Sequence, residues 1–85
     1  MLMENKAIVI FRIHQRNLET DLEIPLDITA NDLVNALNTA YELGIDTSDM
    51  KNCYLKAENP IVLLKGNRLL SDFGVRNGTV INFTE

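Results

Sequence analysis

Hydrophobic residues make up 46% of this 85-residue chain and charged residues 24%, a balance that excludes a disordered chain and a chain built from membrane-spanning segments. Eight basic residues stand against twelve acidic ones, for a net charge of −4, and the basic residues are scattered along the sequence. Because no basic stripe is present to neutralise phosphates, nucleic acid is not an expected partner. We expect a single domain over residues 1–85.

One cysteine, Cys53, is present, so the chain cannot form an internal disulfide or supply the several thiolates of a zinc or iron–sulfur site. A reducing, cytoplasmic location is the default expectation for such a chain. The longest apolar run, Ala7–Phe11, is far short of the roughly 20 residues that cross a bilayer. Direct membrane insertion is therefore not expected, and any membrane contact should pass through a partner.

Residues 1–6 are expected to be flexible, and the first regular element is a predicted strand over Ala7–His14. β-branched and aromatic residues dominate this run, and its polar residues share one parity, so one side of the strand is apolar. A turn is expected at Gln15–Asn17. Leu18–Ile24 then carries a charged residue at every second position until Pro25 stops the strand. Together these segments predict an N-terminal hairpin.

A helix is predicted from Ala30 to Leu43. Thr29 offers its hydroxyl as the N-cap, and Asp32 can return the hydrogen bond and suits the helix dipole. Gly44 stands where a left-handed residue commonly ends a helix. Apolar residues recur at helical spacing on one face, which is expected to pack on the sheet. This face carries Ala30, Leu33, Val34, Leu37, Ala40 and Tyr41.

Three further strands are expected in the second half of the chain. A polar, irregular connection over Ile45–Asn52 leads to strands at Cys53–Glu58 and Ile61–Leu64. The intervening Asn59-Pro60 is typical of a turn and predicts a short second hairpin. The last strand is expected over Thr79–Thr84.

The last third of the chain carries the most informative pattern. Over Leu69–Phe83 the chain carries, in order, a leucine, a Ser-Asp turn start, an aromatic residue, a tight Asn-Gly turn and an alternating strand. This segment resembles the final turn and strand of ubiquitin-like chains. The residues that carry the resemblance are Leu70-Ser71-Asp72-x-Gly74-Val75-x-Asn77-Gly78.

The order strand, strand, helix, strand, strand, strand fits the same class. It predicts an α+β, ubiquitin-like β-grasp fold, in which a mixed sheet of four to five strands packs on one α-helix. The first and last strands are then parallel neighbours at the centre of the sheet, where the most apolar strands belong. One core is expected to enclose Leu33, Leu37, Leu70, Val75, Ile81 and Phe83.

Within this fold the chain resembles the small YukD/EsaB-like proteins, which are bacterial ubiquitin-like accessories of type VII (WXG-type) secretion systems. The resemblance covers the first hairpin, the capped helix, the Cys53–Leu64 hairpin and the closing pattern. It implies a non-enzymatic protein-interaction module of the bacterial cytoplasm. Its implied partner is a component at the membrane, such as the FtsK/SpoIIIE-type ATPase or another subunit of the secretion machine, which would recruit it to the inner face of the membrane.

Two other functions remain open at this point. A ubiquitin-like modifier or a sulfur carrier is activated at the carboxylate of a C-terminal Gly-Gly, whereas this sequence ends in Phe83-Thr84-Glu85. A self-associating structural subunit would instead form a weak homodimer through the open face of the sheet or through a strand edge.

No catalytic, cofactor-binding or metal-binding constellation is expected. His14 lies at a strand end without a recognisable nucleophile or carboxylate companion. Cys53 has the inner parity of its strand and reads as a small buried residue. Asp46 and Asp49 lack the central glycine and the terminal glutamate of a calcium loop. We therefore expect a protein that is not an enzyme and needs no cofactor.

The remaining candidate for function is the open face of the sheet, on the side away from the helix. Strand alternation places several apolar and basic residues there, which is the composition of a binding patch. The alternative is that these residues only support the central strand or are covered by residues 1–3. The predicted protein-binding residues are Ile8, Ile10, Arg12, Tyr54, Lys56 and Asn82.

Overall fold

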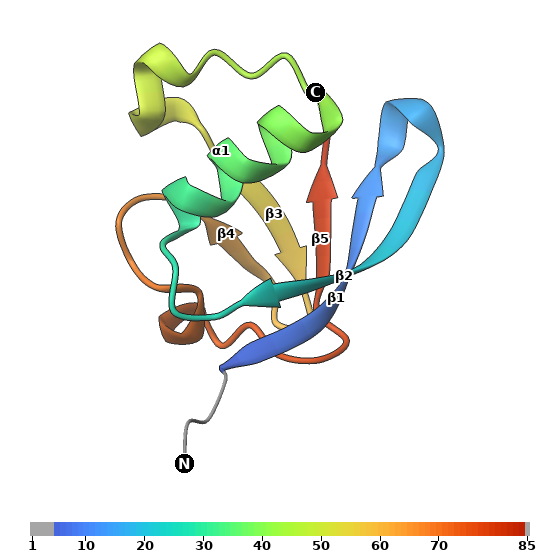
Figure 1. Ribbon diagram of the computed structural model, residues 1–85, viewed down its shortest axis with the longest axis vertical. Helices are drawn as coiled ribbons and strands as arrows, with labels where there is room; N and C mark the ends of the chain where they lie inside the picture. The colour runs from blue at the N-terminus through green and yellow to red at the C-terminus, as the bar shows by residue number, and fades with distance from the viewer. Residues whose placement is uncertain (1–4, 85) are drawn as a thin grey trace.

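A five-stranded sheet and an α-helix that crosses one face of it form the described part of the protein (Figure 1). The computed structural model describes residues 5–84, except for the side chain of Met50. The elements are β1 (Lys6–Ile13), β2 (Leu18–Pro25), α1 (Ala30–Tyr41), β3 (Leu55–Glu58), β4 (Val62–Leu64) and β5 (Val80–Phe83). Short 3-10 helices lie in the connections: η1 (His14–Arg16), η2 (Thr47–Asn52) and η3 (Leu70–Phe73).

The strand order is β2-β1-β5-β3-β4, with β1 and β5 as parallel neighbours. All other strand pairs are antiparallel, so the sheet is mixed. Figure 1 shows the blue first strand beside the red last strand, with α1 lying across the same side of both. The predicted ubiquitin-like α+β fold, with its first and last strands paired at the centre, is confirmed.

The first strand begins earlier than the expected Ala7. Lys6 pairs with Pro25 at the end of the β1–β2 ladder. The backbone N–H of Leu26 also donates a 2.7 Å hydrogen bond to the carbonyl of Asn5. Of the segment expected to be flexible, residues 1–4 lie outside the described part of the chain.

The start of α1 follows the sequence prediction. The hydroxyl of Thr29 accepts a 3.1 Å hydrogen bond from the N–H of Asp32, and the Asp32 carboxylate accepts a 3.2 Å bond from the N–H of Thr29. This capping box satisfies backbone donors that the first turn of a helix otherwise leaves unpaired. The predicted N-terminus of the helix at Ala30 is therefore confirmed.

The predicted end of the helix at Leu43 is wrong, because α1 ends at Tyr41 and Glu42 adopts the left-handed conformation with φ +51°. The physical reason is a contact from the first hairpin. The Arg16 guanidinium donates to the carbonyls of Tyr41 (2.6 Å) and Glu42 (2.8 Å). These bonds satisfy terminal carbonyls that a longer helix would have used itself.

Three strands are shorter than predicted. The thiol of Cys53 meets the carbonyls of Asp46 and Asp49 at 3.4 Å, so this residue belongs to the end of the preceding loop and β3 begins only at Leu55. Thr79 closes the turn before β5, because its hydroxyl donates to the carbonyl of Asn59 and accepts from the N–H of Arg76. In the other hairpin, β4 starts one residue after the predicted Ile61.

The core lies between α1 and the face of the sheet that α1 covers. All six residues expected in it are buried. One residue of the predicted apolar helix face differs, because Ala40 is exposed in the last turn. There the ring of Tyr41 packs on Phe11, with 5.1 Å between centroids, and covers the core in its place. Among the helices of residues 5–84, none combines the length and the hydrophobicity that a membrane crossing requires.

Candidate functional site

The predicted binding residues lie in different environments on the open side of the sheet. Ile8 is 53% exposed, whereas Ile10 and Arg12 are half-buried on the same strand. Lys56 is exposed on β3. Tyr54 is also exposed, but it precedes β3 and lines a separate hollow at the end of the sheet. The sixth residue, Asn82, is buried.

One row of paired residues crosses all five strands on this open face. Glu19 of β2 stands opposite Arg12 of β1, which stands opposite Asn82 of β5. Asn82 in turn faces Lys56 of β3, and Lys56 faces Leu63 of β4. The row therefore runs from an acidic edge on β2, through polar central strands, to an apolar edge on β4.

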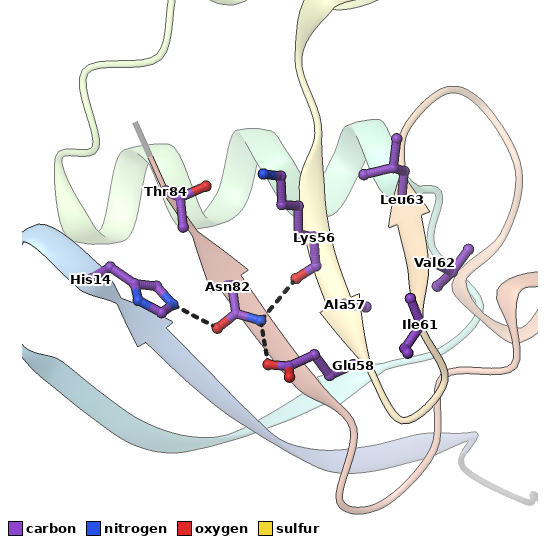
Figure 2. A pocket seen from close by; sticks show the side chains of 9 residues that line it. All are labelled: His14, Lys56, Ala57, Glu58, Ile61, Val62, Leu63, Asn82 and Thr84. Carbon is purple, nitrogen blue, oxygen red and sulfur yellow. Dashed lines mark hydrogen bonds between the residues drawn. The ribbon is translucent and has the colours of Figure 1, made fainter.

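Asn82 connects three neighbours beneath the open face. Its Nδ2 donates to the carboxylate of Glu58 (2.9 Å) and the backbone carbonyl of Lys56 (3.3 Å), and its Oδ1 lies 2.8 Å from Nε2 of His14 (Figure 2). Because Nδ2 already donates, Oδ1 accepts from His14, whose Nε2 must then carry a hydrogen. Asn82 is only 6% exposed, so the structure places it as a support of this face, and its amide is not free for a partner.

Arg12 is likewise engaged within the protein. Its Nε lies against the carboxylate of Glu19, and its Nη1 is 3.8 Å from the carboxylate of Glu58. One cation thus stands between two carboxylates. Lys56 makes no ion pair within the described part of the chain. Of the two basic residues predicted to rim the patch, Lys56 therefore has the less compensated charge.

A hollow of about 480 Å³ lies where β3, β4 and β5 meet (Figure 2). Ile61 and Leu63 stand on its β4 side and are 91% and 49% exposed. Lys56, Glu58 and His14 are among its polar lining residues. Among the large hydrophobic residues that the structure describes, Ile61 is the most exposed. The most accessible apolar surface of this face therefore lies at β4, away from the predicted centre on β1.

The contribution of β4 to this surface was not among the predictions from the sequence. Leu64 is fully buried, and strand alternation then places Leu63 and Ile61 on the opposite side. That signal was available from the sequence. It could not show, however, that the neighbouring strands leave a hollow beside these two residues.

The candidates for chemistry are held in structural contacts. His14 meets the amide of Asn82, and Cys53 is 5% exposed. Burial, and then the negative charges of Asp49 and Asp46, raise the pKa of the Cys53 thiol, which disfavours the reactive thiolate. Hydrogen bonds from Ser48 lower the pKa of the Asp46 carboxyl. Within residues 5–84 no group of three or more histidine, cysteine, aspartate or glutamate side chains could hold a metal ion.

Solved structures similar to this chain are ubiquitin-like domains. The domain of tubulin-binding cofactor B has a TM-score of 0.72 at 20% identity, over 94% of this chain and 89% of that one. The C-terminal domain of mouse tubulin-specific chaperone e gives 0.66 at 12% identity, over 100% and 93%. The domain of Plasmodium falciparum Dsk2 gives 0.59 at 21% identity, over 93% and 99%. At these identities the likeness establishes the protein's fold alone, which is ubiquitin-like.

Its sequence places it more narrowly. The family described as "WXG100 protein secretion system (Wss), protein YukD" matches residues 8–82, which is most of the chain. The chain therefore belongs to the YukD family, as the sequence resemblance predicted. It is a ubiquitin-like accessory protein of WXG100 secretion. Comparison with curated protein sequences gives no match.

Proposed function

We propose that this protein is a non-enzymatic interaction module that binds another protein of the secretion machine through the open face of its sheet. The observation that carries the proposal is the exposed pair Ile61 and Leu63 beside the hollow at β3, β4 and β5. Exposed apolar residues that gather at one place commonly mark an interaction site. Covering them would remove apolar surface from water, at roughly 25 cal/mol per Å².

The surroundings of His14, the candidate base, and of Cys53, the candidate nucleophile, support a non-enzymatic function. A catalytic histidine needs a group to deprotonate or protonate within hydrogen-bond reach, but Nε2 of His14 is directed at an amide oxygen. The Cys53 thiol is enclosed and has a raised pKa. Both side chains are better explained as parts of the fold.

The proposed location and partner follow from the family. A secretion accessory acts beside a membrane machine, so we place the protein in the cytoplasm and expect a partner to recruit it to the inner face of the membrane. The FtsK/SpoIIIE-type ATPase, or another subunit of the machine, is the proposed partner. The proposal involves neither a cofactor, nor nucleic acid, nor direct insertion into the bilayer.

We propose a monomer in preference to a weak homodimer built at the β2 edge. Glu19, Asp21 and Glu23 alternate along β2 and are all exposed, and the ion pairs of Glu19 with Arg12 and of Glu23 with Lys6 compensate only part of this negative charge. In an antiparallel pair of two β2 strands these carboxylates would share one face with their own copies. Like charges that stand opposite each other destabilise such a pair.

Affinity capture from the source bacterium tests the proposal. The full-length protein should retain a component of the secretion machine, and Leu63→Asp should lose it, because the substitution puts a charge at the rim of the hollow. Asn35→Asp is a matched control, since Asn35 is exposed on α1 at the other side of the protein. If the folded Leu63→Asp protein retains the same component as the parent, the open face at β4 is not the interface.

A further inference from the structure

The charged groups around the hollow differ in how far the protein itself compensates them. Glu58 accepts a hydrogen bond from Asn82 and lies 3.8 Å from Nη1 of Arg12. His14 is paired with the same amide. Lys56 is exposed on the wall of the hollow and makes no ion pair within residues 5–84. A positive charge without an ion pair in the described residues therefore lies on β3, opposite Leu63 of β4.

We infer that the hollow recognises an acidic and aliphatic segment of a protein partner. An aliphatic side chain of that segment contacts Ile61 and Leu63, and a neighbouring aspartate or glutamate pairs with Lys56. This inference rests on the proposed function and specifies the chemistry of the partner at the same site.

Local charge complementarity selects the partner segment. A partner that covers Ile61 and Leu63 also removes water from the adjacent lysine, and a buried charge without a counterion is costly. A carboxylate on the partner compensates that cost, while a basic residue at the same place adds repulsion. The net charge of −4 disfavours acidic partners at long range, so the selection acts at contact.

The shape of the site favours a protein side chain over a small molecule. The hollow of about 480 Å³ lies on a sheet surface, and Ile61 at its rim is 91% exposed. Figure 2 shows the lining side chains spread along β3, β4 and β5, with His14 on the far side of Asn82. Small-molecule sites usually enclose roughly 70–90% of the ligand surface. This site instead leaves its apolar residues open to solvent, where the surface of a protein partner can cover them.

A selection from random peptides tests the inference and does not require the natural partner. A phage library of random twelve-residue peptides is selected on the immobilised full-length protein, and the affinities of enriched peptides are measured by fluorescence polarisation. We expect enriched peptides to carry leucine, isoleucine or valine next to aspartate or glutamate. Lys56→Glu should weaken their binding about tenfold, and replacing the acidic residue of the peptide by lysine should restore binding to this variant.

Two control variants make the result specific. Lys51→Glu has the same charge change in η2, where Lys51 lines a different hollow, and should leave peptide affinity within about twofold. Lys56→Gln removes the charge without adding a carboxylate beside Glu58, and it should weaken binding about threefold to fivefold. The melting temperatures of all variants establish that they are folded.

Two results would overturn the inference. One is that the enriched peptides are basic or uncharged, and the other is that Lys56→Glu leaves the affinity of every enriched peptide unchanged. The capture experiment separates this failure from failure of the proposed function. A partner that is lost with Leu63→Asp but kept with Lys56→Glu would show that the face binds by another chemistry. A partner kept with both variants would contradict both proposals.

Discussion

The two faces of the sheet come from the same five strands but use their apolar residues differently. On the face covered by α1, Phe11 and Ile81 are at most 1% exposed, and Leu37 of the helix packs against this face at 5%. On the open face, Ile61 and Leu63 remain accessible, while most charged residues of that face form ion pairs with one another. The covered face therefore holds the fold together, whereas the open face is the one for which we propose recognition. Substitutions on the two faces should therefore change different measurements.

The largest expected effect is on the covered face. Leu37→Ala should lower the free energy of unfolding by about 2–5 kcal/mol, because it leaves a cavity between helix and sheet. Ile61→Ala, on the open face, should change it by less than about 0.5 kcal/mol. Urea denaturation of both variants measures the difference. A loss below about 1 kcal/mol for Leu37→Ala would contradict the stabilising function assigned to the covered face.

The next effect concerns recognition and compares two parts of the open face. Ile61→Asp should weaken partner binding by about 2 kcal/mol or more, because it charges an apolar anchor of the proposed interface, and its melting temperature should stay within a few degrees of the parent. Ile10→Asp should also lower stability, because Ile10 is half-buried and stands opposite Asp21. Titration calorimetry with the captured partner measures the affinities. Loss of binding by folded Ile10→Asp alone would move the interface to β1.

A smaller effect is expected at the polar support of the open face. Asn82→Ala should lower the free energy of unfolding by about 1–2 kcal/mol, because the partners of the amide lose their hydrogen bonds. Asn82→Asp keeps an acceptor for His14 but brings a carboxylate to the carboxylate of Glu58. It should therefore be less stable at pH 7 than at pH 4, relative to the parent. Equal stability of Asn82→Ala and the parent would show that this network contributes nothing.

The smallest effect is a pH dependence from Cys53. Its pKa in the folded protein is raised above the value of about 8.5 in an unfolded chain. The stability it contributes is therefore present below that pH and declines as the pH rises through the raised pKa of the folded state. Unfolding curves at pH 7 and pH 10 should show a smaller decline for Cys53→Ala than for the parent. An identical decline in both proteins would exclude this thiol as its source.

Most of the fold could be predicted because its signals are local. The Thr29 and Asp32 capping box lies within one turn, and strand alternation needs only adjacent residues. The end of α1 could not be predicted, because Arg16 reaches it from another element. The burial of Asn82 could not be predicted from the sequence for a similar reason. Alternation shows which side of the sheet a residue faces, but not whether side chains from other strands cover it.

The parallel pairing of β1 and β5 has a consequence for how the protein is made. Ile10 pairs with Val80, so the centre of the sheet cannot close until a segment about 70 residues later has left the ribosome. Before then β1 and β2 can form only a hairpin, and Val9 and Phe11 lack the strand that later lies beside them. Contacts so distant in sequence slow folding, and apolar surface that waits for its partner is prone to aggregate. The newly made chain thus has a period of vulnerability that ends only when β5 pairs with β1.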